Sequence, residues 1–411
     1  MEDQQEEIVT IVAIGHKGDG VAETGSGGLF VPLSLPGERL RVTRLGERGA
    51  ILEVLEPSPD RVVPACPHFG ICGGCALQHM AEPAYLEMKR QAIVAAFADR
   101  GIEVEVPTPV TVPPKSRRRA VIAVQRTSRG NVAGFRERLS HTVAEASQCV
   151  IVTEAIRTAL PALARLAEVL SFDKKGAIFA VIDTETGLDV TVMEGKLAES
   201  RRQEAIPLAL KLGLARFSVG SEIIVEARAP IVHFGKAAVV PPPGAFLQAV
   251  AAAEHAMVAE VLTAATGARR VADLFSGCGT FALRLAETAR VTAVESDRRA
   301  LDALERAARH TPGLKPVETE ARDLFRRPLM AKELAAFDAV VFDPPRDGAA
   351  AQAKEIAKSK VPVAVAVSCN PATLARDARY LIDGGYKLTS VKAFDQFLWS
   401  HHVEVVAQFN R

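Results

Sequence analysis

A single cysteine stands directly after a long apolar run in the last part of the chain. Cys369 follows the run at residues 361–367 and precedes a proline and a helix-like stretch in "VSCNPATLARD". The run is rich in valine and lacks polar alternation, so it predicts a strand of a parallel sheet that is buried on both faces. Ligands of open α/β sheets bind outside the carboxyl ends of the strands. This position makes Cys369 a candidate nucleophile, although a free cysteine is also commonly inert packing.

Three other cysteines are closely spaced, and a fourth lies far downstream. Cys66, Cys72 and Cys75 have the spacing C-x5-C-x2-C in "CPHFGICGGC", and Cys149 follows in "ASQCVI". Three thiolates with a remote fourth can enclose a metal centre, and in a reducing compartment this arrangement is favoured over disulfides. Zinc and a 4Fe-4S cluster both accept four cysteines, and the spacing favours neither. The glycine pair before Cys75 suits the tight turn that wraps a metal.

A glycine-containing turn joins a predicted strand to a predicted helix in "VADLFSGCGTF", residues 271–281. Asp273 lies near the end of the strand, and Gly277 and Gly279 would let a ligand approach the backbone closely. A second strand, "VTAVESD", ends near Glu295, which is placed to accept hydrogen bonds from ribose hydroxyls. The pattern G-x-G-x-x-G that nicotinamide enzymes use for pyrophosphate is absent. The turn therefore suits S-adenosylmethionine, which has no phosphate.

One more predicted strand ends in a charged group held by prolines. In "FDAVVFDPPRDG", residues 337–348, Asp343 comes before two prolines and Arg346. The prolines fix the backbone after the strand and leave the Asp343 carboxylate free to point at the edge of a planar substrate.

Composition limits the class of protein. The chain has 411 residues, of which 48% are hydrophobic and 24% charged, and it begins with the acidic "MEDQQEE". No uncharged apolar run approaches the length of a bilayer span, so we expect a cytoplasmic protein without a membrane partner. A net charge of +1 excludes a globally basic nucleic-acid coat but permits a local patch. One such patch begins at "KSRRR", residues 115–119, and continues with Arg126, Arg129, Phe135, Arg136 and Arg138.

The elements predict a multidomain chain with breaks near residues 58 and 238. Residues 1–58 contain short alternating runs separated by glycine-rich turns, which predict a small all-β barrel. Residues 59–238 contain the cysteines, a helix near 82–98 and hairpin strands in "AIFAVIDTETGLDVTVME", and so predict a central α+β domain. Residues 239–411 alternate helical and strand patterns, which favours a doubly wound, Rossmann-like α/β domain.

Several long motifs resemble those of the S-adenosylmethionine-dependent RNA 5-methyluridine methyltransferases, specifically the iron-sulphur-containing 23S ribosomal RNA type. They include "RVVPACPHFGICGGCALQH", "GFRERLSHTVAEASQC", "DLFSGCGTF", "FDPPR" and "SCNPATLARD", and the opening barrel looks like a TRAM domain. The resemblance implies a 4Fe-4S cluster on the four cysteines, Cys369 as nucleophile and Glu404 as general base. It also implies that the cofactor and uracil pockets are lined by Gln248, Phe275, Gly277, Gly279, Thr280, Glu295, Asp323 and Asp343.

The chemistry of this family requires such residues. Carbon 5 of uracil is a poor nucleophile, but addition of the Cys369 thiolate to carbon 6 makes an enolate that can attack a methyl group. The proton on carbon 5 must then leave, and the Glu404 carboxylate can remove it. Asp343 suits the N3-H of uracil, whereas cytosine has no proton on N3, so uracil is the expected base.

The chain departs from the family pattern at a few positions. Ser276 stands where the turn often has cysteine, and we interpret Cys278 between the glycines as packing. Val250 replaces a common asparagine, so one contact to substrate or cofactor is expected to be lost. Aromatic residues make up only 5% of the chain, and we expect the few that could stack on a flipped base to lie mainly in the core. These are Phe69, Phe135, Phe246 and Trp399.

Alternatives remain open at this stage. A transfer-RNA 5-methyluridine enzyme is the rival within the enzyme class, and the sequence does not identify the nucleotide. An iron-sulphur redox protein would leave Cys369 and Glu404 without a role, and both residues also argue against a non-catalytic RNA-binding protein. We expect a monomer that acts on ribosomal or transfer RNA and not on DNA.

Overall fold

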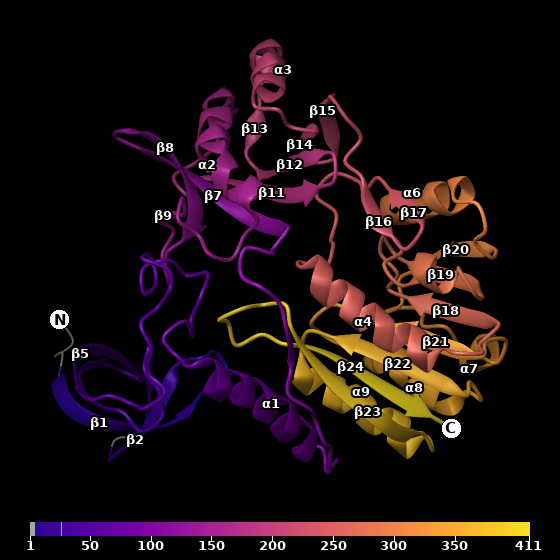
Figure 1. Cartoon of the computed structure of the whole chain (residues 1–411), viewed down its shortest axis with the longest axis horizontal. Coiled ribbons are helices and arrows are strands. Elements are labelled where there is room, and N and C mark those ends of the chain that lie inside the picture. Colours follow the sequence, from indigo (N-terminus) through magenta and orange to yellow (C-terminus); the bar gives the residue numbers. More distant parts are fainter. Residues whose placement is uncertain (1–4, 26) are drawn as a thin grey trace.

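The computed structural model describes residues 5–25 and 27–411 and shows three units (Figure 1). The N-terminal unit is a closed barrel with the strand order β1-β2-β3-β5-β4. Its strands are β1 (Gln5–Ile14), β2 (Gly20–Thr24), β3 (Gly27–Val31), β4 (Arg39–Leu45) and β5 (Arg48–Glu56). Alternation along β4 places Leu40 and Val42 in the barrel core with Leu29.

The predicted small β-barrel is therefore confirmed. Strand β2 has only five residues, GVAET, and is too short and mixed in composition to show a period in the sequence. Residues 1–4, where the predicted unit 1–58 begins, lie outside the described residues.

The central unit is built on a mixed sheet with the order β15-β14-β12-β11-β7-β8-β9. Its strands are β7 (Arg119–Thr127), β8 (Gly130–Arg136), β9 (Val143–Glu145), β11 (Ala177–Thr184), β12 (Gly187–Glu194), β14 (Arg216–Val219) and β15 (Glu222–Glu226). Helices α2 (Glu154–Leu166) and α3 (Arg202–Lys211) pack on it and share its core. The expected hairpin is formed by β11 and β12, which pair from Ile178↔Glu194 to Thr184↔Gly187.

Short elements complete this unit. They are β10 (Leu170–Ser171) paired with β13 (Lys196–Leu197), and the 3-10 turns η1 (Ala167–Val169) and η2 (Glu199–Arg201). The hairpin of β16 (Val232–Phe234) and β17 (Ala237–Val239) follows and packs in the core of the C-terminal unit.

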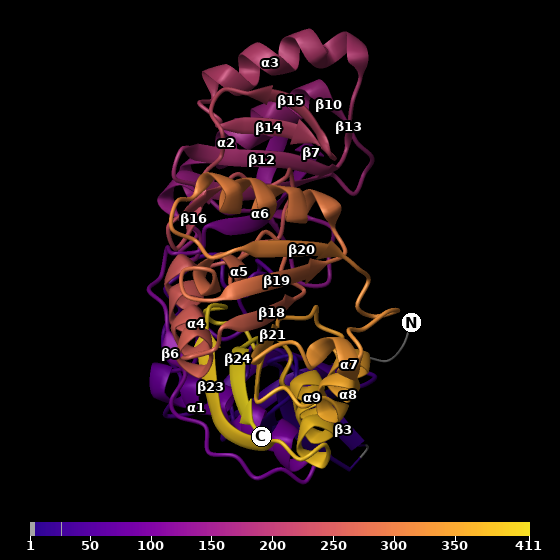
Figure 2. The ribbon, with the colours of Figure 1, turned by 90° about the vertical axis from the view of Figure 1, so that its right-hand side faces the viewer.

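The C-terminal unit is the predicted doubly wound α/β fold. Its sheet has the order β20-β19-β18-β21-β22-β24-β23-β6, and Figure 2 shows β20, β19, β18 and β21 stacked in this order. The strands are β18 (Arg270–Leu274), β19 (Arg290–Glu295), β20 (Val317–Ala321), β21 (Ala339–Phe342), β22 (Val363–Ser368), β23 (Lys387–Asp395) and β24 (Glu404–Asn410). Strands β18 to β22 are parallel, and β24 is antiparallel to both β22 and β23. The strand order reverses between β18 and β21, which is where such folds bind ligands.

Helices cover both faces of this sheet. One core contains residues of α4 (Ala251–Ala264), α5 (Ala282–Leu285) and α6 (Arg298–His310). The other contains residues of α7 (Ala331–Leu334), α8 (Ala350–Lys358) and α9 (Pro371–Asp383). Along β22, Val365 and Val367 face the first core and Ala364 and Ala366 the second, so the continuous apolar run is explained by burial on both faces.

A segment of the middle of the chain also packs on the C-terminal sheet. Helix α1 (Glu82–Ala98) places Ile93 and Phe97 in the same core as α8 and α9, and β6 (Val110–Thr111) pairs in parallel with β23. The fully buried Lys89 of α1 forms an ion pair with Asp395 at the end of β23. The boundaries at 58 and 238 stay a prediction, but α1 and β6 share their packing with the sheet that follows the second boundary.

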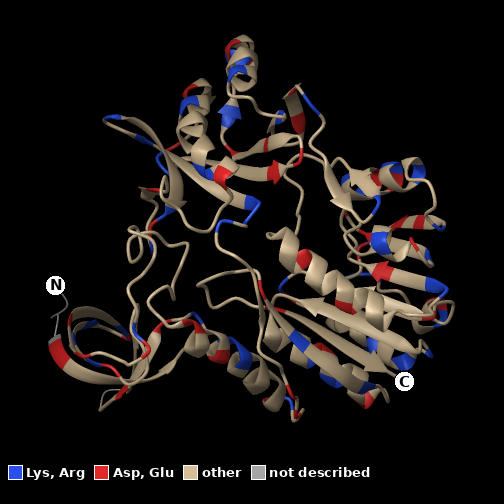
Figure 3. Ribbon diagram, viewed as in Figure 1, with Lys and Arg blue, Asp and Glu red and all other residues tan. Residues whose placement is uncertain are grey.

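Charged residues of both signs are mixed over all three units in Figure 3, in keeping with the net charge of +1. Over residues 5–25 and 27–411, no helix is both long and apolar enough to cross a membrane.

Candidate active site and cysteine centre

Cys369 lies directly after β22, at the carboxyl end of the strand. The side chain of Asn370 accepts a hydrogen bond from the amide of Ala372 and so caps α9 immediately after the cysteine. Cys369 is half-buried and lines a cavity of about 1300 Å³ together with residues of the barrel and of α1. The thiol is therefore accessible to a substrate that enters this cavity.

The surroundings of Cys369 act on its pKa in opposite directions. Burial raises the pKa of the thiol to about 11, and the carboxylates of Glu404 and Asp343 add to the rise. The guanidinium of Arg346 opposes it by its charge and by a hydrogen bond. Arg346 is itself held against His402, whose Nδ1 lies 2.7 Å from Nη2 of the arginine. Arg346 thus supplies the cation that favours a thiolate.

A hydrogen-bonded chain of buried side chains joins Glu404 to Asp343. Nε2 of Gln396 donates to Oε1 of Glu404 at 2.8 Å and to Oε1 of Gln248 at 2.7 Å. Nε2 of Gln248 in turn donates to Oδ2 of Asp343 at 3.2 Å. These hydrogen bonds hold three segments in fixed positions relative to one another: the start of β24, the end of β21 and the connector before α4.

The two carboxyl groups of this chain are unusually weak acids. Burial raises the pKa of Glu404 to about 8, the charge of Asp343 adds to the rise, and Gln396 and Arg346 oppose it. Burial raises the pKa of Asp343 to about 7, while the hydrogen bond from Gln248 lowers it. A carboxylate with a pKa near neutrality is an effective base for a proton on carbon.

The glycine turn after β18 has the conformation that the sequence suggested. Gly277 and Gly279 have φ of 54° and 98°, and a Cβ on Gly279 would lie 2.9 Å from Leu304. A Cβ on Gly277 would meet nothing within 4 Å, so this glycine faces open space. Its amide donates to Oε2 of Glu295 at 3.1 Å. Phe275 has φ of 60°, a strained value for a residue with a side chain.

Acidic groups stand at three neighbouring strands beside this turn. Asp273 in β18 is fully buried, and burial raises its pKa well above the usual value, while a hydrogen bond from the backbone amide of Ala282 opposes the rise. Glu295 ends β19, and Asp323 follows β20 and accepts the amide of Phe325 at 3.0 Å. Thr280, between the turn and α5, is half-buried. A fully buried carboxylate and a glycine that faces open space fit a polar cofactor at this edge.

The four cysteines of the middle segment lie together although they come from two stretches of chain. Burial raises the pKa of Cys75 to about 12, and Cys149, Cys72 and Cys66 each add to the rise, so all four thiols are within electrostatic range of one another. The amide of Gly74 donates to Sγ of Cys72 at 3.4 Å, and that of Ile151 to Sγ of Cys149 at 3.4 Å. Such contacts stabilise thiolates.

The fit of this group to a metal depends on the kind of centre. Among the described residues, no group of three or more His, Cys, Asp or Glu could hold a metal ion. A single zinc ion requires every sulfur at about 2.3 Å from one point. A 4Fe-4S cluster distributes its four thiolates over four irons and so separates them more widely. The donors, four thiols with amides directed at two of them, are of the chemical kind that a 4Fe-4S cluster takes.

The predicted basic patch divides into arginines with different surroundings. Nη2 of Arg118 donates to Oε2 of the fully buried Glu254 at 2.7 Å, which makes this arginine a structural link. Arg136 contacts His141 and the carbonyl of Lys175. Arg117 and Arg119 have no carboxylate within ion-pair distance in the described part of the chain.

The expectation that the aromatic candidates lie in the core is wrong for Phe246, which is 65% exposed. It lies in the irregular connector between β17 and α4, where the polar side chain of Gln248 is buried and that of Phe246 is turned outward. Phe69, Phe135 and Trp399 are partly buried. Cys278, interpreted as packing, is 3% exposed and belongs to a hydrophobic core.

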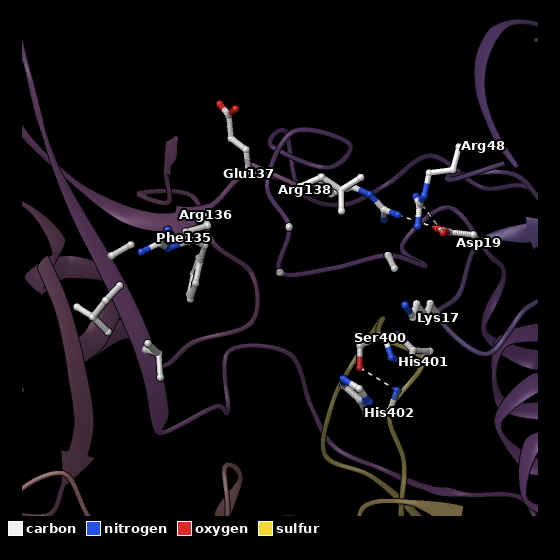
Figure 4. A pocket seen from close by; sticks show the side chains of 17 residues that line it. Lys17, Asp19, Arg48, Phe135, Arg136, Glu137, Arg138, Ser400, His401 and His402 are labelled. Atoms are coloured by element: carbon white, nitrogen blue, oxygen red, sulfur yellow. Dashed lines mark hydrogen bonds and ion pairs between the residues drawn. The ribbon is translucent and has the colours of Figure 1, made fainter. Parts of the chain in front are cut away.

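A second cavity, of about 570 Å³, lies between the barrel, the cysteine segment and the central sheet (Figure 4). Asp19 accepts from Arg138 at 2.7 Å at its edge. The cavity shares His401 and His402 with the cavity that contains Cys369. The basic residues that line it are Lys17, Arg48, Arg136 and Arg138.

Sequence reasoning missed two side chains of the site. Gln396 was not considered, although a glutamine inside the apolar stretch "AFDQFLW" is a polar residue that needs buried partners. Phe325 was also missed: it is 49% exposed and its ring centroid lies 5.4 Å from that of Phe275, which forms an apolar surface beside the glycine turn.

Comparisons with known proteins find RNA methyltransferases. Residues 240–411 match the family described as tRNA (Uracil-5-)-methyltransferase. An uncharacterized RNA methyltransferase of Mesorhizobium japonicum is 51% identical over 98% of this chain and 97% of its own length. The 23S rRNA (uracil(1939)-C(5))-methyltransferase RlmD of Alkalilimnicola ehrlichii is 35% identical over 98% of this chain and 96% of its own length.

A solved structure is similar over the whole chain. The tRNA (uracil-54, C5)-methyltransferase of Pyrococcus abyssi, in complex with S-adenosyl-L-homocysteine, superposes with a TM-score of 0.75 at 25% identity. The similarity covers 98% of this chain and 99% of that one.

Proposed function

Because the chain belongs to the tRNA/rRNA uracil-5-methyltransferase family and is an RNA methyltransferase, we propose that it methylates carbon 5 of one uridine in RNA through a covalent intermediate on Cys369. The observation that carries this proposal is the convergence of a half-buried thiol, a nearby guanidinium and a buried weak acid. Cys369, Arg346 and Glu404 come from three separate strand ends and influence one another electrostatically.

The proposed reaction begins when the Cys369 thiolate adds to carbon 6 of uracil, which moves the electron pair of the 5,6 double bond to carbon 5 and oxygen 4. S-adenosylmethionine, when bound, supplies the methyl group that carbon 5 takes up. Glu404 then removes the proton from carbon 5, the double bond reforms and the bond from sulfur to carbon 6 breaks. Glu404 with a pKa of about 8 suits this last step.

We assign recognition of uracil to Asp343. Its carboxylate accepts the N3-H of uracil, and Nε2 of Gln248, 3.2 Å away, fixes the oxygen that does not face the base. Cytosine, without a proton on N3, would leave the other oxygen of this buried carboxylate without a donor, which is unfavourable.

The cofactor site lies along the ends of β18, β19 and β20. Gly277 and Gly279 open the turn, and Thr280 lies beside it. Glu295 and Asp323 offer acceptors to the ribose and adenine, while Phe275 gives an apolar surface. These assignments follow the motif match and the open, acidic edge described above.

The finer features of the family remain part of this proposal. We assign a 4Fe-4S cluster to Cys66, Cys72, Cys75 and Cys149, supported by the mutual proximity of the thiols. The five-stranded barrel is proposed as an RNA-binding TRAM-like domain within residues 1–58, followed by a cluster domain at 59–238 and the methyltransferase domain at 239–411. We further propose a cytoplasmic monomer.

The substrate that we propose is 23S ribosomal RNA. The curated relative at 35% identity acts on 23S rRNA by its name, and the cysteine motif resembles that type. Transfer RNA is the second candidate, because the solved structure with a TM-score of 0.75 is a tRNA enzyme. Mapping 5-methyluridine in both RNAs from a strain that lacks this protein distinguishes them: loss from tRNA alone contradicts the proposed substrate.

The mechanism is tested by trapping the intermediate. Glu404→Gln retains the thiol but not the base, so methylated RNA should accumulate attached to the protein, while turnover falls roughly 100- to 10,000-fold. A denaturing gel with methyl-labelled cofactor and cellular RNA detects this adduct. Cys369→Ala is the matched control and should give neither adduct nor S-adenosylhomocysteine. Normal turnover by Glu404→Gln, or an adduct in Cys369→Ala, would contradict the assigned roles.

A further inference from the structure

The consecutive arginines at 117–119 have two kinds of environment. Arg118 is neutralised by Glu254, which also accepts from Arg284 at 2.8 Å. Arg117 and Arg119 have no salt bridge and no side-chain hydrogen bond among the described residues, yet their guanidinium nitrogens are not sealed from solvent. Burial lowers the pKa of Arg119, and the charge of Arg117 lowers it further, so two like charges are held close together. Arg117 also lies within electrostatic range of Cys75 and Cys149, whereas Arg119 has a like charge beside it and no carboxylate within ion-pair distance in the described part of the chain, which favours an anion from outside the chain at Arg119.

Each of these arginines lies on an aromatic ring. Cζ of Arg119 is 4.7 Å from the ring centroid of Phe246, and Cζ of Arg117 is 5.6 Å from that of Phe397. Phe246 is 65% exposed, so much of the ring beyond the contact with Arg119 remains open. An exposed aromatic ring beside unpaired guanidinium groups has the composition of sites that stack a base and hold its phosphate.

Both arginines are connected to the active site through short paths. Phe246 precedes the buried Gln248 by two residues, and Gln248 donates to Asp343. Phe397 follows Gln396, and its ring contacts that of His402 at a centroid distance of 5.8 Å. His402 in turn holds Arg346, the cation next to Cys369.

The backbone of this segment is fixed from both sides. The amide of Arg117 donates to Ile151 at 3.1 Å, and that of Arg118 donates to Ala249 at 2.8 Å. The two free guanidinium groups are therefore presented by a rigid stretch between the central unit and the methyltransferase unit.

We propose that Arg117, Arg119 and Phe246 form a binding site for the nucleotide next to the target uridine. The open part of the Phe246 ring stacks the base of this nucleotide, and the two guanidinium groups bind its phosphate. The ligand class is single-stranded RNA, because a paired base does not expose its face to a side chain. The site rests on the proposed function, which it extends from the target base to its neighbour.

The experiment measures binding of a fluorescein-labelled single-stranded oligouridylate over a range of salt concentrations, with full-length protein. Arg119→Gln removes one phosphate contact and should flatten the slope of log affinity against log salt by about 0.7. Phe246→Leu keeps an apolar side chain but removes the ring, and should weaken binding roughly 5- to 100-fold with little change of slope.

Arg126→Gln is the matched control. Arg126 lies near the other end of the same strand, β7. Its Cζ is 5.0 Å from the ring centroid of Phe172, so it is also an arginine stacked on a ring, but far along the strand from Arg119. It should match wild type in both affinity and slope. Melting curves of all variants verify folding, and an exposed Phe246 makes misfolding of Phe246→Leu a small risk.

Two outcomes would overturn the site: wild-type slope and affinity in both Arg119→Gln and Phe246→Leu, or equal losses in Arg126→Gln. Failure of the proposed function gives a different result. A wild-type enzyme that makes no 5-methyluridine in any RNA would contradict the methyltransferase chemistry, but the binding measurements would still show whether Arg119 and Phe246 bind single-stranded RNA.

Discussion

The proposed catalytic crevice and the proposed cluster site both contain cysteines, but they are built differently. Cys369 follows a parallel strand whose two faces are buried, and its neighbours Asp343 and Glu404 stand at the ends of adjacent strands. Cys66, Cys72 and Cys75 lie in a stretch with only isolated bridges and turns, and Cys149 lies in another. The sheet alone can keep the geometry of the crevice, whereas the four cysteines lie in two loop segments that the proposed cluster would join.

The two regions are also in direct contact. The amides of Ala76 and Leu77, next to Cys75, donate to the carbonyl of Trp399 at 2.8 and 3.0 Å. Lys89 of α1 donates to the carbonyl of His402 at 2.6 Å. Trp399 and His402 belong to the loop that leads to Glu404, so a centre without catalytic groups still restrains the loop that positions the base.

The largest expected effect tests whether Cys369 and the four clustered cysteines have different roles. Cys369→Ala should lower turnover by a factor on the order of 10⁶, as removal of other covalent nucleophiles does, and should leave iron content and melting temperature close to wild type. Methyl-transfer assays and iron analysis of the same preparation measure both. Cys278→Ala, at a buried core position, is the control and should retain turnover. Loss of iron from Cys369→Ala would mean that the regions are not separable.

The second expected effect concerns iron. Protein purified without oxygen should contain about four irons per chain, and Cys149→Ala should lose them and melt at a lower temperature, because the remote cysteine joins two segments. Metal analysis and thermal unfolding follow these changes. Stoichiometric zinc in the wild type, or full iron in Cys149→Ala, would contradict the cluster assignment.

The connection through α1 is tested by Lys89→Met. Both Lys89 and Asp395 are fully buried, so removal of the ammonium leaves an uncompensated carboxylate and should cost about 3–5 kcal/mol of unfolding free energy. Urea unfolding measures the loss. Lys392 of the same strand, β23, pairs with Glu260 of α4, and their side chains are 42% and 20% exposed. Lys392→Met breaks this pair and should cost about 0–1 kcal/mol of unfolding free energy. Equal losses in the two variants would show that α1 is not a specific anchor.

The weak acid of the crevice should make stability depend on pH. The pKa of Glu404 is about 8 in the folded protein and near its ordinary 4.5 when unfolded, so the folded state holds the extra proton between these values. This contribution to stability is complete below pH 4.5 and is lost as the pH rises through 8. Glu404→Gln lacks the titration, and its melting temperature should fall less than that of the wild type over this range. If the melting temperatures of the wild type and of Glu404→Gln change in parallel with pH, the titrating group is a residue other than Glu404.

The smallest expected effect sharpens the role of Gln396. Its hydrogen bond lowers the pKa of Glu404, so Gln396→Met should raise that pKa by up to about one unit. The elimination step, followed in single-turnover reactions, should then require a higher pH, while formation of the adduct continues. An unchanged pH profile of elimination would remove Gln396 as a partner of the base.

Local patterns predicted much of the chain because the relevant forces act between near neighbours. The apolar runs that became β18, β21 and β22 were recognisable from composition, and the helix expected near 82–98 is α1 (Glu82–Ala98). Each strand end then located a functional group, Glu295, Asp343 or Cys369, because parallel strands bring their carboxyl ends to one edge.

Tertiary structure decided what depends on residues far apart in the chain. The sequence placed Arg117, Arg118 and Arg119 in one basic patch, and only packing against Glu254 separated the structural arginine from the two free ones. Gln396 became a link between Glu404 and Gln248 because β24 and the connector before α4 meet around it. Burial also sets the acidity of Glu404. The sequence by itself thus determined which groups stand at the strand ends, whereas long-range packing determined their partners, because desolvation and hydrogen bonding depend on every segment that surrounds a side chain.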